Sequence, residues 1–104
     1  MEPAVRLAYL AAGAFFLTAL VTGVWKYAWM ARSDDHQAPY YVNTAHRASL
    51  LYSFAAILLA EFARLSTNAD LVDLAAVAVV AFFFAFAIGS YVLHGLLRDT
   101  DNQF

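Results

Sequence analysis

Two long stretches without a charged residue limit the folds open to this chain more than any other feature. The first runs from Leu7 to Trp25 and is 19 residues long, and the second runs from Leu74 to Leu97 and is 24 residues long. Because an α-helix rises about 1.5 Å per residue, the first stretch alone would span roughly 28 Å, close to the thickness of a bilayer's hydrocarbon core. Each stretch therefore predicts a membrane-spanning helix.

The composition supports the same class of protein. The chain is 63% hydrophobic and 13% charged, which is more apolar surface than a soluble domain of 104 residues can hide in one small core. It contains no cysteine, so disulfide bridges and thiolate metal sites are excluded. A formal net charge of −2 gives no sign of nucleic-acid binding. We expect one integral membrane domain over residues 1–104, in contact with lipid.

The polar segments between the apolar stretches predict three helices. Residues 31–42 should form a first loop, where Pro39 disfavours helix. Residues 65–70 are too short for anything but the turn of an antiparallel hairpin. A cleaved signal peptide is the alternative for the first stretch, but its apolar region would be shorter. We expect an all-α bundle of three transmembrane helices over about residues 4–30, 44–64 and 71–97.

Local patterns predict how the second and third helices begin and pack. Asn43 or Thr44 could cap the second helix by accepting from its first free N–H groups. Small residues at spacings of three or four allow membrane helices to approach closely. Such patterns occur at Ser49, Ser53, Ala56 and Ala60, and again at Ala81, Ala85 and Gly89.

All three histidines should lie at one end of this bundle, which we call the loop-1 end. They are His36 in the first loop, His46 near the start of the second helix and His94 near the end of the third. His46 suits an axial haem ligand, a proton relay or an interfacial hydrogen bond. His36 is most simply a solvated loop residue, and a structural zinc site is disfavoured because it usually includes thiolates.

The basic residues predict an orientation. The loop-1 end holds four of them and the other end two: Lys26, Arg32, Arg47 and Arg98 against Arg6 and Arg64. Since cytoplasmic segments carry the excess of Lys and Arg, the first loop and the C-terminus should face the cytoplasm. The expected location is a bacterial inner membrane.

Three segments carry a resemblance to a known family. Ala45-His46-Arg47-Ala48 opens the second helix, Tyr91 lies late in the third, and Asn102-Gln103-Phe104 closes the tail. Together they resemble the small membrane isomerases typified by styrene oxide isomerase and, more distantly, hydroxylaminobenzene mutase. The likeness covers most of the second and third helices and the tail, whereas the first helix is similar only in character.

The resemblance implies a cofactor, an assembly and a reaction. Enzymes of this family are homotrimers that hold haem b at subunit interfaces, and their axial histidine corresponds to His46. Ferric iron there acts as a Lewis acid on an epoxide oxygen, so that the ring opens and an aldehyde forms. A tyrosine beside the reacting centre corresponds to Tyr91, the catalytic residue expected here. The expected cofactor-binding residues are His46, Tyr52, Tyr91 and His94.

The chain also departs from the family. Tyr52 stands where the family has an asparagine, and its phenol would narrow the pocket or occupy the open side of the iron. His94 has no counterpart in the family; as a second haem ligand it would block catalysis. The family continues into a fourth helix, so this chain is either a three-helix variant or shorter than the gene product.

A different class of function fits the composition as well. Small membrane proteins rich in small-residue seams and aromatic belts serve as accessory subunits of large respiratory or photosynthetic complexes. In that case Phe82, Phe83, Phe84 and Phe86 would form a surface facing lipid or a partner. A haem enzyme should be coloured and should self-associate, whereas an accessory subunit should be colourless and travel with a larger complex.

Overall fold

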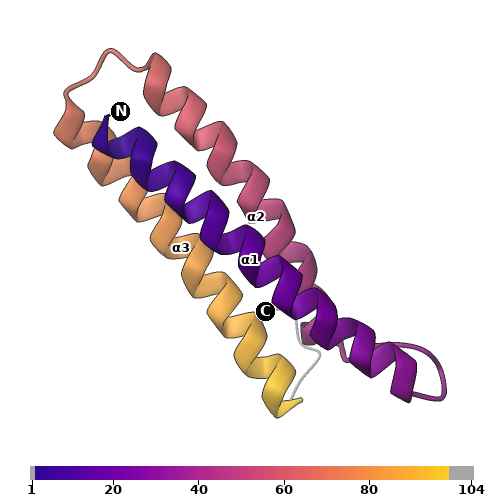
Figure 1. Cartoon of the computed structure of the whole chain (residues 1–104). Coiled ribbons are helices and arrows are strands. Elements are labelled where there is room, and N and C mark those ends of the chain that lie inside the picture. The colour runs from indigo at the N-terminus through magenta and orange to yellow at the C-terminus, as the bar shows by residue number, and fades with distance from the viewer. Residues whose placement is uncertain (1, 99–104) are drawn as a thin grey trace.

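The computed structural model describes residues 2–98, and in this part of the chain it contains three α-helices and no strand. The helices are α1 (Pro3–Arg32), α2 (Tyr40–Leu65) and α3 (Asp70–Leu97). Consecutive helices run antiparallel in a bundle about 54 Å long (Figure 1). Each helix is long and apolar enough to cross a membrane. The expected all-α bundle of three helices is therefore confirmed, and the chain is an integral membrane protein.

Helix α2 begins four residues earlier than the sequence pattern predicted. Its N-cap residue is Pro39, and the N–H of Asn43 already donates to the Pro39 carbonyl at 3.1 Å. The Thr44 hydroxyl donates to the Tyr40 carbonyl, four residues back. The prediction that Asn43 or Thr44 caps the helix was wrong, because both residues lie inside it. Proline favours an extended residue before it but places no restriction on a helix that starts after it.

The contact between α1 and α2 is built from small side chains. Ser49, Ser53, Ala56 and Ala60 are all at most 1% exposed, which confirms the predicted packing seam on α2. They pack with a matching series on α1, namely Ala4, Ala8, Ala12 and Ala19. The Ser49 and Ser53 hydroxyls donate to carbonyls of their own helix, so these buried polar groups are satisfied. Small residues on both sides allow the two backbones to lie close together.

Helix α3 packs through a different face from the one predicted. Its buried residues are Asp73, Val77, Ile88 and Gly95. Ala85 and Gly89 are exposed, and a Cβ added at Gly89 would meet nothing within 4 Å. The prediction that they form a contact seam is therefore wrong for this chain by itself, because the larger side chains of α3 occupy the contact face. The small residues are left facing outward.

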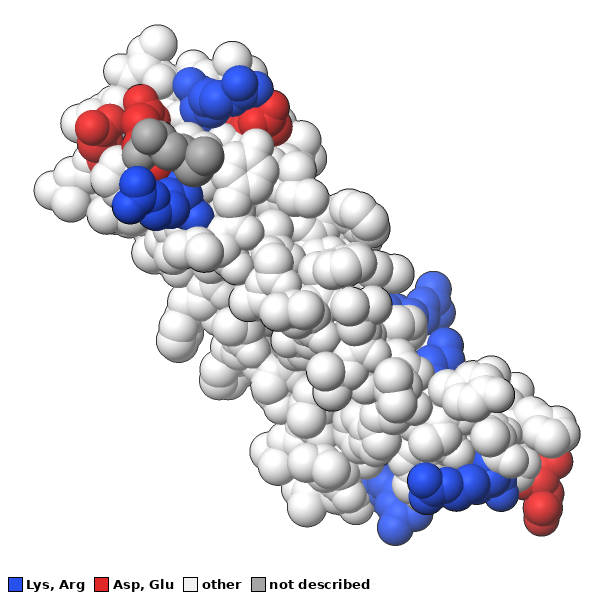
Figure 2. All heavy atoms as spheres, in the orientation of Figure 1, with Lys and Arg blue, Asp and Glu red and all other residues white. Residues whose placement is uncertain are grey.

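Charged side chains are concentrated near the two ends of the bundle. On the face shown in Figure 2 most of them gather toward each end, and one basic side chain lies nearer the middle at the edge of the view. This distribution follows from the sequence, because no Lys, Arg, Asp or Glu occurs between residues 6 and 26 or between residues 73 and 98. An apolar middle with charged ends matches the polarity profile of a bilayer.

Candidate functional site

The side chain of His46 lies between α2 and α1 and is tied to the α1 backbone. Its Nδ1 lies 2.9 Å from the Ala19 carbonyl oxygen, which also accepts from the Thr22 hydroxyl at 3.2 Å. A carbonyl oxygen can only accept, so Nδ1 carries a proton in this contact. His46 is in the second turn of α2 rather than the first, and it is partly buried. The main chain of α1 therefore fixes the orientation of the ring.

Gly23 provides the space for this ring. A Cβ added at Gly23 would lie 2.9 Å from His46 Cε1 and 3.2 Å from Nδ1. Contacts that short are not tolerated, so only glycine fits while the ring keeps its place. Neither Gly23 nor Ala19 was expected from the sequence as a partner of His46. The one available signal was a glycine inside a membrane-spanning stretch, where a close approach is a common reason for its presence.

The second ring nitrogen of His46 is left without a hydrogen-bond partner among residues 2–98. In a neutral imidazole with its proton on Nδ1, Nε2 keeps its lone pair. Histidines that bind a metal typically donate their other N–H to a backbone carbonyl or a carboxylate, which fixes the tautomer. The donor chemistry at His46 therefore fits a single axial ligand to haem iron.

A second group of aromatic side chains lies between α2 and α3. The rings of Tyr41 and Tyr91 are stacked with centroids 6.0 Å apart, and His94 lies against Tyr41 at 5.3 Å. The Tyr52 ring is stacked on Phe84 at 4.3 Å, and its hydroxyl interacts electrostatically with that of Tyr91. Three of the predicted site residues, Tyr52, Tyr91 and His94, thus belong to one cluster. We call it the tyrosine cluster.

Within one chain, His46 and the tyrosine cluster lie on opposite edges of α2. His46 reaches toward α1, whereas Tyr41 and Tyr52 reach toward α3, and the buried Ser49 and Ser53 separate the two edges. In the described part of the chain, neither Tyr52 nor Tyr91 forms a ring contact or a hydrogen bond with His46. A single copy therefore does not enclose one pocket between His46 and Tyr91.

A lateral groove of about 540 Å³ runs along the outer face of α2. Tyr91 of α3 forms part of its wall, and the remaining lining comes from α2: Tyr40, Asn43, Thr44, Arg47, Ala48, Leu50, Leu51 and Phe54. The polar residues belong to the first two turns of the helix, and the apolar ones follow deeper along the span. The groove is therefore polar at one end and apolar at the other.

Other predicted residues take simpler places. His36 is exposed in the first loop, with its Nδ1 3.3 Å from the Met30 carbonyl oxygen. Across residues 2–98, no three His, Asp or Glu side chains converge in a way that could hold a metal ion. That finding does not bear on haem, whose iron needs only one or two protein ligands. The tail motif Asn102-Gln103-Phe104 lies outside the described residues.

Comparisons with protein families, with curated proteins and with solved structures found no match for this chain.

Proposed function

We propose that this chain is a haem b-binding integral membrane protein in which His46 is the axial ligand of the iron. The observation that carries the proposal is the state of the His46 ring. Its Nδ1 donates to the Ala19 carbonyl, and no hydrogen bond within residues 2–98 uses its Nε2. A half-buried imidazole oriented by a backbone carbonyl is the arrangement in which protein-bound haem iron and other metals find their histidine ligands.

The site would be completed between copies of the chain. His46 lies on the α1 edge of α2 and the tyrosine cluster on the α3 edge, so one edge of one copy can face the other edge of the next. Contacts between two different patches produce a closed ring of copies when the rotation between neighbours fits. The enzymes of the family that this chain resembles form such a ring of three copies. The outward-facing Ala85 and Gly89 would allow such copies to approach closely.

The chemistry is proposed to be the isomerisation of a small apolar, epoxide-like substrate. His46 would hold the haem, which would supply Lewis-acid chemistry toward the epoxide oxygen. The hydroxyls of Tyr52 and Tyr91, which interact with each other, would present a donor to the oxygen as negative charge develops on it. The apolar span around them excludes water. In this proposal the loop-1 end faces the cytoplasm of a bacterial cell.

Absorption spectroscopy tests the haem assignment directly. We expect a Soret band in the detergent-purified protein, its loss in His46→Ala, and its retention in the matched control His36→Ala, which changes an exposed loop histidine. The reduced spectrum, compared with that of His94→Ala, distinguishes one axial histidine from two. A full haem complement in His46→Ala, or no Soret band when haem is supplied during expression, would refute the assignment.

Turnover is tested with the haem-loaded protein and a small aryl epoxide. Tyr91→Phe should keep the Soret band and lower the rate of aldehyde formation by about 10²-fold, the usual effect of removing one donor to a developing oxyanion. Unchanged turnover in Tyr91→Phe would remove Tyr91 from the catalytic role. Absence of any turnover in the wild-type protein would leave a haem protein without isomerase activity.

One observation favours a second candidate, a non-catalytic accessory subunit of a larger respiratory or photosynthetic complex. Phe82, Phe83 and Phe86 are each more than 60% exposed on α3, whereas Phe84 turns inward against Phe15 and Tyr52. Three exposed phenylalanines on one helix form an apolar surface that lipid or a helix of a partner subunit can cover. Colourless protein that co-purifies with a large complex after mild solubilisation would favour this candidate over the haem enzyme.

A further inference from the structure

Two ionised side chains interrupt the apolar face of α2, one near each end. Arg47 and Glu61 bracket the uncharged residues 48–60. A helix of 26 residues is roughly 39 Å long, so a hydrocarbon core of about 30 Å centred on it would include both Cα atoms, that of Glu61 about 2 Å and that of Arg47 about 7 Å inside the nearer edge. At that depth a charged group needs a partner or a route to the interface.

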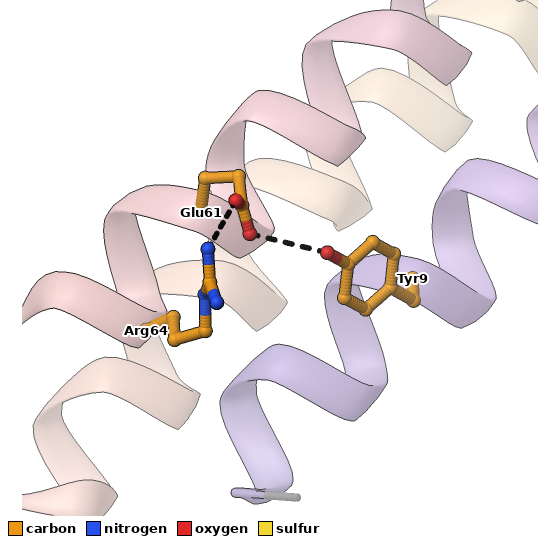
Figure 3. A network of polar contacts seen from close by, with 3 residues as sticks. All are labelled: Tyr9, Glu61 and Arg64. Carbon is orange, nitrogen blue, oxygen red and sulfur yellow. Dashed lines mark hydrogen bonds and ion pairs between the residues drawn. The ribbon is translucent and has the colours of Figure 1, made fainter.

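Glu61 has partners within the chain. Its carboxylate accepts a hydrogen bond from the Tyr9 hydroxyl at 3.1 Å and forms an ion pair with Arg64 (Figure 3). Tyr9 belongs to α1 and Arg64 to α2, so groups from two helices contact this carboxylate. The negative charge at this end of α2 is thus compensated by residues of the protein itself.

Arg47 has no such compensation. Within residues 2–98 it forms no ion pair and no hydrogen bond, and it is exposed on the outer face of α2. It lies instead in the wall of the lateral groove, with Tyr40, Asn43 and Thr44 around it at the polar end. The apolar end of the groove, which includes Leu50, Leu51 and Phe54, continues toward the middle of the bilayer.

We propose that the lateral groove binds one anionic phospholipid, whose phosphate pairs with Arg47 and whose acyl chain lies along the apolar end. The charge is complementary, since a guanidinium forms bidentate hydrogen bonds with a phosphate. The depth also agrees, because an arginine side chain that starts inside the hydrocarbon core can extend to the lipid phosphates just outside its edge. The Tyr40 hydroxyl and the Asn43 amide at the polar end supply hydrogen bonds to the remaining headgroup oxygens. This proposal does not depend on haem binding.

Native mass spectrometry of the full chain in detergent tests the site. Delipidated protein is titrated with phosphatidylglycerol and, separately, with phosphatidylcholine. We expect phosphatidylglycerol to bind more tightly, and Arg47→Gln to weaken its binding by about tenfold, the usual effect of losing one charge-assisted contact. Arg32→Gln removes an equally exposed arginine from the same end of the bundle and should leave the affinity unchanged.

Two further arms test the groove and the source of the phosphate. Leu51→Trp fills the apolar end without changing the charge, and it should weaken phosphatidylglycerol binding as well. An excess of inorganic phosphate should not displace the lipid. Equal affinity of Arg47→Gln and wild type, an equal loss in Arg32→Gln, or displacement by inorganic phosphate would overturn the proposal. His46→Ala should bind the lipid normally, so failure of the haem assignment and failure of the lipid site give different results.

Discussion

The two ends of the bundle are stabilised in different ways. At the loop-1 end, rings pack against glycines: His46 lies on Gly23, and Trp25 lies on Gly95. At the opposite end, polar side chains bond to one another, as in the contacts of Glu61 with Tyr9 and Arg64 (Figure 3). Both ends also contain close apolar packing, so the ends differ in what is added to it: rings fitted against glycines at one end and hydrogen bonds between side chains at the other.

The difference indicates where function is to be sought. At the far end the Glu61 and Asp73 carboxylates both have partners within the chain, and the Ser66 hydroxyl donates to the buried Asp73. At the loop-1 end, neither His46 Nε2 nor the Arg47 guanidinium has a hydrogen-bond partner among residues 2–98. Polar groups that remain unpaired inside the hydrocarbon region are costly unless a ligand, a lipid or another subunit satisfies them. Haem binding by His46 and phospholipid binding at Arg47 are both proposed for this end.

The largest effect is expected from Gly95→Ala. A Cβ there would lie 2.9 Å from Trp25 and 3.2 Å from both a side-chain carbon and the backbone nitrogen of Val42. Backbone cannot move aside as a flexible side chain can, so α3 must shift away from α1 and α2. We expect a destabilisation of ~2–3 kcal/mol, measured by denaturant unfolding in detergent. Gly89→Ala, on the same helix with open space around it in one chain, should be neutral or slightly stabilising, because alanine favours a helix more than glycine does. A loss of equal size there would mean that contacts between copies, not packing within one chain, were measured.

A smaller effect is expected from Gly23→Ala, because the group that must move is a side-chain ring. The new methyl would displace the His46 ring and break its contact with the Ala19 carbonyl. We expect a loss of ~1–2 kcal/mol in unfolding free energy. Gly13→Ala is the control on α1, since nothing lies within 4 Å of the added atom. If Gly23→Ala unfolds like the control, the ring does not rest on Gly23.

Much of this fold could be predicted from the sequence, because lipid imposes strong and simple constraints. Uncharged stretches of sufficient length must be helices, and the Ser49 and Ser53 seam followed from small residues at fixed spacing. Contacts specific to one pair of helices could not be predicted in the same way. Spacing places His46 on a face of α2 but does not say which neighbouring helix that face meets, and Ala85 and Gly89 had the right spacing on the wrong face.

The candidate site was predictable in its residues but not in its arrangement. The sequence placed His46, Tyr91 and His94 at one end of the bundle, and the structure agrees. It gave no means of telling that His46 and Tyr91 lie on opposite edges of α2, because that depends on the rotation of each helix about its axis. The early start of α2 contributes to this outcome, since it carries Tyr41 into the helix and against Tyr91.

At the far end, Ser66→Ala tests the importance of polar pairing. The Ser66 hydroxyl accepts from the Asn68 N–H at 3.1 Å and donates to Asp73 Oδ1 at 2.8 Å, and Asp73 is only 8% exposed. Its loss leaves a buried carboxylate without this donor. We expect a destabilisation of ~1.5 kcal/mol in the same unfolding assay. Thr67→Ala, at the exposed neighbouring position, should change little; equal effects of the two variants would show that the turn as a whole, not this hydrogen bond, was perturbed.

The smallest effect is expected from Glu61→Gln, which keeps the shape of the side chain and removes its charge. The Arg64 and Glu61 side chains are 64% and 38% exposed, so water and headgroups already screen the ion pair. We expect a loss below ~1 kcal/mol, further reduced by added salt. Tyr9→Phe deletes only the hydroxyl that bonds Glu61, and the double variant should cost less than the two single changes added together. A loss of several kcal/mol in Glu61→Gln would mean that this end depends on its charge as strongly as the loop-1 end depends on its glycines, and the contrast between the two ends would no longer hold.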